Sequence, residues 1–204
     1  MREKSCLDCL PDDLKVRNEV YDLIHAGTDA HLTSDRERSE KDLHWATELI
    51  YGEVMFQHFI PTLEYAKPAP GEVFWDLGCG GGKPLMTASL AFPQLKACKG
   101  LELLEQLTNL ATSIGGKLHE ECAKRELTFS PVEIHKGDML KFDWTDADIV
   151  YLSAVCFSDK LVAGVADLFQ RVKKGTRVIS LKEIPERAFL ELYATIKVKM
   201  TWGV

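Results

Sequence analysis

From Gly71 onward, the sequence alternates short apolar runs with stretches in which apolar residues recur at helical spacing. The apolar runs predict strands at 73–77, 96–102, 132–135, 148–152 and 177–181. The stretches between and after them predict helices at 84–92, 104–125, 159–172 and 188–196. Strands that alternate with helices form a parallel sheet covered on both faces. We therefore expect an α/β protein with a Rossmann-like, doubly wound, mainly parallel sheet whose site lies at the carboxyl ends of the strands.

The first part of the chain has a different pattern. Residues 12–26 carry one apolar stripe, and apolar residues return at helical spacing from Leu43 to Ile60. Between them, the segment 36–42 interleaves acidic and basic residues, which predicts a solvated surface. We expect residues 1–50 to form a helical N-terminal extension that lies against an α/β domain at residues 51–204.

Composition narrows the function. A chain of 204 residues with 46% apolar residues suits one domain with a modest appendage. No apolar run is long enough to cross a bilayer, and the charged N-terminus does not resemble a signal peptide, so we expect an intracellular protein without membrane contact. The formal net charge of −6 argues against strong nucleic-acid binding by this chain alone. The six cysteines, including Cys6 and Cys9, are predicted to be free thiols, and no metal site is expected.

A glycine-rich loop, Asp76-Leu77-Gly78-Cys79-Gly80-Gly81-Gly82, directly follows the first apolar run. Its glycines permit a tight turn and let a ligand lie against bare backbone. A dinucleotide fingerprint would require a small residue at position 83 or 85, where the chain has Lys83 and Leu85. An acid two residues before the first glycine is instead typical of sites for S-adenosylmethionine (SAM). The candidate SAM-binding residues of the loop are Asp76, Leu77, Gly78, Cys79, Gly80 and Gly82.

Two further elements follow the next predicted strands. Glu102, with Leu103 beside it, ends the second strand, where a carboxylate can accept both ribose hydroxyls of an adenosine. Asp138 and Met139 come just after the third strand, where they can bind the adenine amino group and cover the ring. Three such elements in this order predict SAM as the cofactor.

At this point the chain resembles a known family. Tyr51-Gly52-Glu53 lies upstream of the glycine loop, Phe157 follows the fourth strand, and Lys174-Gly175-Thr176-Arg177-Val178-Ile179-Ser180-Leu181-Lys182 leads into and through the fifth. These residues resemble the disruptor-of-telomeric-silencing (Dot-one) family of histone lysine methyltransferases that lack a SET domain. The resemblance covers roughly residues 50–184.

The resemblance implies that residues 51–204 are a SAM-dependent methyltransferase domain that acts on a protein lysine, such as one in a histone. It places Tyr51, Gly52, Glu53 and Val54 over the cofactor and agrees with the roles of Glu102, Asp138 and Met139. Tyr51, Ser153 and Phe157 are the candidate catalytic residues, and Ser153 also borders the cofactor. The implied location is the nucleus, with the cytoplasm as the alternative.

The chain departs from the family pattern in two places. The family has a paired Asn-Asn after the fourth strand, where this chain has Ser153 and Ala154. The family sheet also has a further strand after a Ser-Trp-Thr-Gly-like turn, and the present sequence ends at Val204, so this last strand is expected to be missing. Two other functions therefore stay open: a methyltransferase for a small molecule or nucleic acid, and a catalytically weak SAM-binding partner protein.

Overall fold

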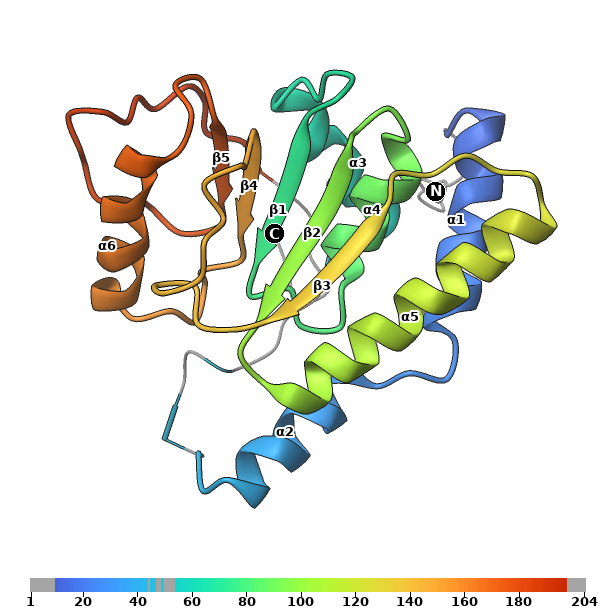
Figure 1. Cartoon of the computed structure of the whole chain (residues 1–204), viewed down its shortest axis with the longest axis horizontal. Helices are drawn as coiled ribbons and strands as arrows, with labels where there is room; N and C mark the ends of the chain where they lie inside the picture. The colour runs from blue at the N-terminus through green and yellow to red at the C-terminus, as the bar shows by residue number, and fades with distance from the viewer. Residues whose placement is uncertain (1–9, 44, 47–48, 50–53, 198–204) are drawn as a thin grey trace, which may run out of the picture.

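The computed structural model describes residues 10–43, 45–46, 49 and 54–197. Its centre is a parallel sheet of the strands β1 (Val73–Leu77), β2 (Ala97–Glu102), β3 (Val132–Lys136), β4 (Ile149–Leu152) and β5 (Arg177–Ser180). The strand order is β3-β2-β1-β4-β5 (Figure 1). The predicted Rossmann-like α/β fold and all five predicted strands are confirmed, with ends that differ by one residue at most.

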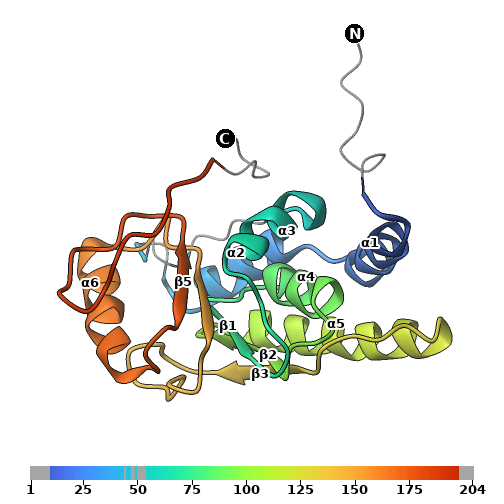
Figure 2. The ribbon, with the colours of Figure 1, turned by 90° about the horizontal axis from the view of Figure 1, so that it is seen from above.

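Helices cover both faces of the sheet (Figure 2). The helices α3 (Phe56–Tyr65), α4 (Lys83–Ala91) and α5 (Glu105–Lys124) lie on one face, and α1 (Asp12–His25) packs against these three helices. The other face packs against α6 (Asp159–Leu168) and the short 3-10 helix Phe169–Arg171 that follows it. Side chains alternate along β1, so that Phe74 enters the first core and Trp75 the second. This buried strand thus contributes to two apolar cores, which explains why its residues other than Asp76 are apolar.

Helix α1 is part of the larger core. Its residues Val20, Tyr21 and Ile24 are buried among side chains of α3, α4 and α5. The buried Arg17 donates to the carbonyl oxygens of Leu90, at 2.8 Å, and Thr128, at 2.6 Å. The predicted helix at 12–26 is therefore present and docked, while the division of the chain at residue 50 stays a prediction.

A helix that the sequence pattern did not predict, α2 (Ala30–Glu40), occupies the polar stretch. Asp29 caps it by accepting from the backbone N–H of Leu32. The expectation that the segment 36–42 forms a solvated surface is wrong for Glu37, whose side chain is only 1% exposed. The reason is a tertiary contact with the start of α5, beside which α2 lies in Figure 1.

The helix predicted at 188–196 is also wrong, because this segment has no regular secondary structure beyond a turn at its start. Phe189, Leu192 and Tyr193 are 48%, 83% and 77% exposed. A short helix draws most of its stability from packing an apolar face, and these side chains have no such surface to cover. The predicted helix at 159–172 ends earlier than expected, at Leu168, and tightens into the 3-10 helix.

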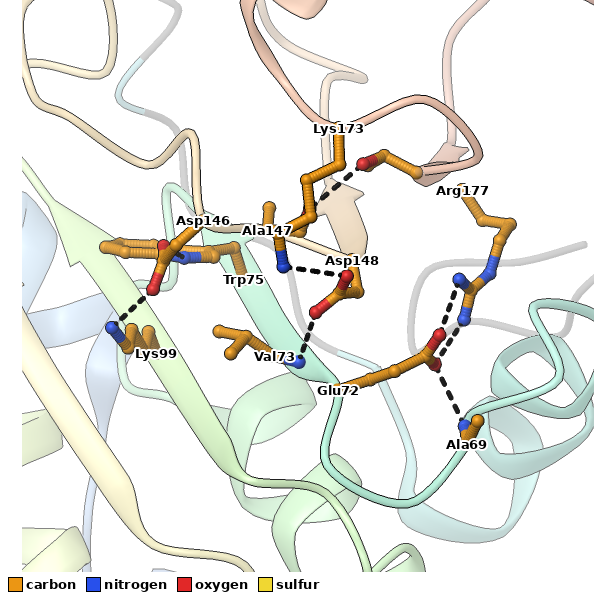
Figure 3. A network of polar contacts seen from close by, with 11 residues as sticks. Ala69, Glu72, Val73, Trp75, Lys99, Asp146, Ala147, Asp148, Lys173 and Arg177 are labelled. Carbon is orange, nitrogen blue, oxygen red and sulfur yellow. Dashed lines mark hydrogen bonds and ion pairs between the residues drawn. The ribbon is translucent and has the colours of Figure 1, made fainter.

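Polar contacts tie together the amino ends of the strands (Figure 3). Asp148 accepts from the backbone N–H of Val73 at 2.9 Å and from Lys173 Nζ at 2.8 Å. Glu72 pairs with both terminal nitrogens of the Arg177 guanidinium. These contacts join β1, β4 and β5 at the edge of the sheet opposite the glycine loop.

Asp146 extends this arrangement to β2. Its two carboxylate oxygens accept from Trp75 Nε1 and from Lys99 Nζ, each at 2.7 Å (Figure 3). Together with His135 and Phe142, these residues line a recess of about 200 Å³ on the face of the sheet away from α4 and α5. The carboxylates of Glu72, Asp146 and Asp148 thus all have partners within the fold.

Candidate functional site

The glycine-rich loop connects β1 to α4 and is held by the neighbouring strand. Gly78, Gly80 and Gly82 have φ values of +84°, +53° and +84°, which residues with a Cβ atom rarely adopt. The backbone N–H groups of Gly78 and Cys79 both donate to the carbonyl oxygen of Leu101, at 2.8 and 3.0 Å. These hydrogen bonds therefore fix the backbone of the loop directly after the end of β1.

Glu102, at the end of β2, orders the loop from the other side. Its Oε2 accepts from the backbone N–H of Gly80 at 2.9 Å. Its Oε1 accepts from the backbone N–H groups of Leu103 and Leu104, at 2.8 and 2.9 Å. Burial raises the pKa of Glu102, and these three amides oppose that rise. Glu102, the acidic residue predicted to bind the cofactor, thus also joins the glycine loop to the start of α5.

Asp76 lies on β1, two residues before Gly78, and is completely buried. Neither of its carboxylate oxygens has a hydrogen-bond partner among the residues that the structure describes. Burial, and then the charge of Glu102, raise the pKa of Asp76 well above its usual value. An unpaired buried carboxylate is costly, so this group is suited to a cationic ligand group.

Aromatic and thioether side chains close over Gly78. A Cβ added at Gly78 would lie 3.3 Å from Phe157 Cζ and 3.6 Å from Met139 Cε. Phe157 comes from the loop after β4, and Met139 comes from the loop after β3. The structure therefore brings together three of the predicted residues from three different strand ends, as expected for a site on the carboxyl edge.

Asp138 begins the turn after β3. Its Oδ1 accepts from the backbone N–H of Leu140 at 2.9 Å, and its Oδ2 lies 3.3 Å from Lys141 Nζ. The preceding Gly137 donates its N–H to the carbonyl oxygen of Glu102 at 2.8 Å, which fixes this turn beside the end of β2. Glu102 and Asp138 are thus held in neighbouring turns, as the cofactor prediction requires.

The loop after β4 carries the two positions at which the chain departs from the family pattern, and their surroundings differ. Ser153 is partly exposed, whereas Ala154 is fully buried in the core that includes Trp75 and Leu77. Lys182 Nζ donates to the carbonyl oxygen of Phe157 at 2.7 Å and pairs with Asp159 at 2.8 Å. Lys182 therefore holds the loop that carries Phe157, a role that its position in the fifth-strand motif did not reveal.

The remaining predicted site residues do not share one environment. Tyr51, Gly52 and Glu53 are outside the described residues. Val54 is buried in the core of α1 and α3, and its carbonyl oxygen accepts from the Tyr21 hydroxyl at 3.4 Å. Leu103 is 51% exposed at the rim of the site. Cys79 is buried, and burial raises the pKa of its thiol well above its usual value, so it packs as an apolar residue.

Within the described ranges, no group of three histidine, cysteine or acidic side chains is placed to hold a metal ion. In the same part of the chain, no helix combines the length and apolar character of a membrane span.

Comparison with known proteins gives a match to the family described as "Histone methylation protein DOT1" over residues 34–198. The H3 lysine-79 specific histone-lysine N-methyltransferase of Eremothecium gossypii is 25% identical over 150 residues, which are 71% of this chain and 26% of that protein. The protein of the same name from Cryptococcus neoformans (strain JEC21) is 30% identical over 143 residues, which are 67% of this chain and 22% of that protein. The chain thus matches about a quarter of the length of these relatives.

Among solved structures, phosphoethanolamine N-methyltransferase 2 of Haemonchus contortus has a TM-score of 0.46 and 20% sequence identity, with 76% of this chain and 36% of that chain covered. The family match confirms the resemblance predicted from the sequence.

Proposed function

The chain belongs to the DOT1 family of histone methylation proteins, and we propose on this premise that it transfers a methyl group from SAM to a lysine side chain of a protein. SAM is the cofactor of this family. The observation that carries the proposal is the buried carboxylate of Asp76, which has no hydrogen-bond partner among the described residues. It lies beside the glycine loop, where the side chains of Phe157 and Met139 cover Gly78.

The residues at the carboxyl edge fit SAM by their chemistry. The Asp76 carboxylate would bind the amino group of the methionyl moiety, because that cation supplies the partner that the fold lacks. Glu102 would bind the ribose, since its three backbone donors leave part of its acceptor capacity free. Asp138 and Met139 would bind the adenine ring.

Bound SAM supplies a methyl group that its sulfonium already activates. The protein then has to align the lysine amine behind that methyl group, and positioning of this kind can provide much of the rate enhancement. A lysine with an ordinary pKa of about 10.4 must also lose its proton, which apolar surroundings favour by destabilising the charged form. Phe157 and Tyr51 are the proposed walls of that channel, and Ser153 borders it.

The proposed substrate is a histone or another lysine-bearing protein, with the nucleus as the location. The net charge of −6 complements a basic protein but not a phosphate backbone. We therefore expect this chain alone to bind duplex DNA weakly at physiological salt, so that a partner or the histone itself provides the contact with chromatin.

A second function has one observation in its favour. Ala154 offers no polar atom where the family pattern has asparagine, and its methyl group is fully buried. A SAM-binding partner protein with little catalysis of its own would tolerate this loss.

The test uses methyl-labelled SAM with core histones, nucleosomes and a cell lysate as acceptors. The proposal expects label in protein lysines, and it expects none with the Gly80→Arg variant, whose side chain would fill the loop. Label in RNA or in small molecules alone would overturn the substrate class. SAM binding without any transfer would favour the partner-protein function.

A further inference from the structure

Helix α2 contributes a buried carboxylate to the start of α5. Glu37 Oε1 accepts from the backbone N–H of Glu105 at 2.9 Å, and Glu37 Oε2 accepts from that of Gln106 at 2.7 Å. The N-cap residue of α5, Leu104, provides no side-chain cap. Glu37 therefore takes the place of a local cap, from a position 68 residues earlier in the chain.

Glu37 and Glu102 divide four consecutive amides between them. Glu102 binds the N–H groups of residues 103 and 104, and Glu37 binds those of residues 105 and 106. The turn that leads from β2 to α5 is thus held by one carboxylate at each end. Only residues 103 and 104 separate Glu102 from the first amide that Glu37 binds, that of Glu105.

Packing and charge support this contact. Ala30 of α2 is buried together with Leu104, the N-cap residue of α5, and Leu107 of that helix. Burial alone would raise the pKa of Glu37, but the Lys41 ammonium and the two backbone amides outweigh it and hold the pKa below its usual value. Glu37 is therefore ionised at neutral pH, and its charge faces the positive end of the α5 dipole.

We infer that Glu37 is a positioning residue for the cofactor site, through which docking of α2 keeps Glu102 oriented toward Gly80 and the SAM ribose. This inference rests on the proposed binding of SAM. It makes SAM affinity depend on a helix that lies outside the strand ends where the cofactor binds.

The experiment measures SAM affinity by calorimetry for the full chain and for Glu37→Ala, Glu37→Gln and Asp35→Ala. Asp35 is a matched control, because it is a well-exposed acid on the same helix. We expect Glu37→Ala to weaken SAM about tenfold and Glu37→Gln about threefold, as for the loss of all or part of a helix cap. We expect Asp35→Ala to have no effect. If Glu37→Ala does not fold, Glu37→Gln decides.

A double-mutant cycle with Glu102→Gln separates positioning from general stability. If Glu37 acts through Glu102, Glu37→Gln should weaken SAM less than about twofold once Glu102 is changed, because coupled residues are not additive. An equal loss in both backgrounds would overturn the inference, as would unchanged affinity in folded Glu37→Ala or an equal loss in Asp35→Ala.

Failure of the proposed function has a different signature. If the wild-type protein does not bind SAM, the cofactor assignment fails, and the inference fails with it. If the wild type binds SAM and both Glu37 variants bind it equally well, only the inference is overturned. Amide hydrogen exchange at Glu105 and Gln106, which should speed up in Glu37→Ala, tests the cap itself without any ligand.

Discussion

Asp76 and Glu102 lie near the carboxyl ends of the neighbouring strands β1 and β2, yet their carboxylates are satisfied very differently. Glu102 accepts three backbone hydrogen bonds, whereas neither oxygen of Asp76 has a partner among the described residues. The negative charge of Glu102 further disfavours ionisation of Asp76. The fold therefore supplies partners to Glu102 but none that the structure describes to Asp76, and an unpaired buried carboxylate costs stability.

This cost predicts that Asp76→Asn stabilises the protein without SAM while it weakens SAM binding. Asparagine removes the buried unpaired charge that Asp76 carries once the pH exceeds its raised pKa, so above that pKa the free energy of unfolding should be higher by about 1–3 kcal/mol. SAM affinity should fall, because the amide cannot neutralise an ammonium group. Urea denaturation and calorimetry measure the two effects. A variant that is less stable than the wild type would mean that Asp76 has a structural partner.

The raised pKa of Asp76 also predicts a pH dependence. The folded state binds a proton more tightly than the unfolded state, so this stabilising contribution is full below the unfolded pKa and is lost as pH rises through the folded pKa. SAM requires the ionised form, so its affinity should increase over that same rise in pH. Calorimetric titrations of SAM at a series of pH values from acid to alkaline check this. Asp76→Asn should remove this part of the dependence, and an unchanged profile would contradict the proposed ammonium contact.

The sheet was predictable because buried parallel strands are mostly apolar, as Val73–Leu77 is apart from Asp76, and because the glycine loop follows this strand. The polar helix α2 was not predictable, because its stability depends on Asp29 and on the contact of Glu37 with α5, which no local pattern encodes. The segment 188–196 has helical spacing but no surface on which to pack. Helical periodicity therefore predicts a helix only where the tertiary fold provides a complementary apolar face.

The prediction of site residues from the sequence has the same limit. Residues next to strand ends, such as Asp138, could be predicted by position, because parallel strands place their carboxyl ends together. The roles of Glu37 and Lys182 depend on backbone groups far along the chain, at Glu105 and Phe157. Such side-chain contacts to distant backbone leave no spacing signal in the sequence.

Gly78→Ala is expected to weaken SAM about tenfold or more. The alanine Cβ would force a strained backbone at φ +84° and would lie 3.3 Å from Phe157 Cζ, so the closure of Phe157 over the loop would be disturbed. Gly116→Ala is a matched control, because Gly116 lies in α5 with open space around its Cβ position. That variant should keep its SAM affinity and gain about 0.5–1 kcal/mol of stability. Equal SAM affinity in both variants would contradict the role of Gly78.

Glu102→Ala should weaken SAM more than Asp138→Ala. Glu102 loses three backbone hydrogen bonds as well as the ribose contact, so we expect a cost of about 1.5–3 kcal/mol in binding. Asp138 holds only its own turn and the exposed Lys141, so we expect about 1 kcal/mol. Calorimetry on both folded variants gives the ranking, and the reverse order would mean that their roles are exchanged.

The two positions that depart from the family pattern should respond differently to asparagine. Ser153 is partly exposed next to the site, so Ser153→Asn can restore an orienting amide and raise lysine methylation, up to about 100-fold, without tightening SAM. Ala154 is fully buried among apolar side chains, so Ala154→Asn should lower the free energy of unfolding by about 2 kcal/mol or more.

Single-turnover rates with labelled SAM and thermal unfolding of each single variant separate these two effects. The double variant is uninformative unless Ala154→Asn alone remains folded. If wild-type protein already methylates nucleosomal histone at an ordinary enzymatic rate, about 1 s⁻¹ or faster, the asparagine pair is dispensable here. Ser153 would then provide the orienting contact with its hydroxyl, and Ser153→Ala should abolish the activity that Ser153→Asn was expected to raise.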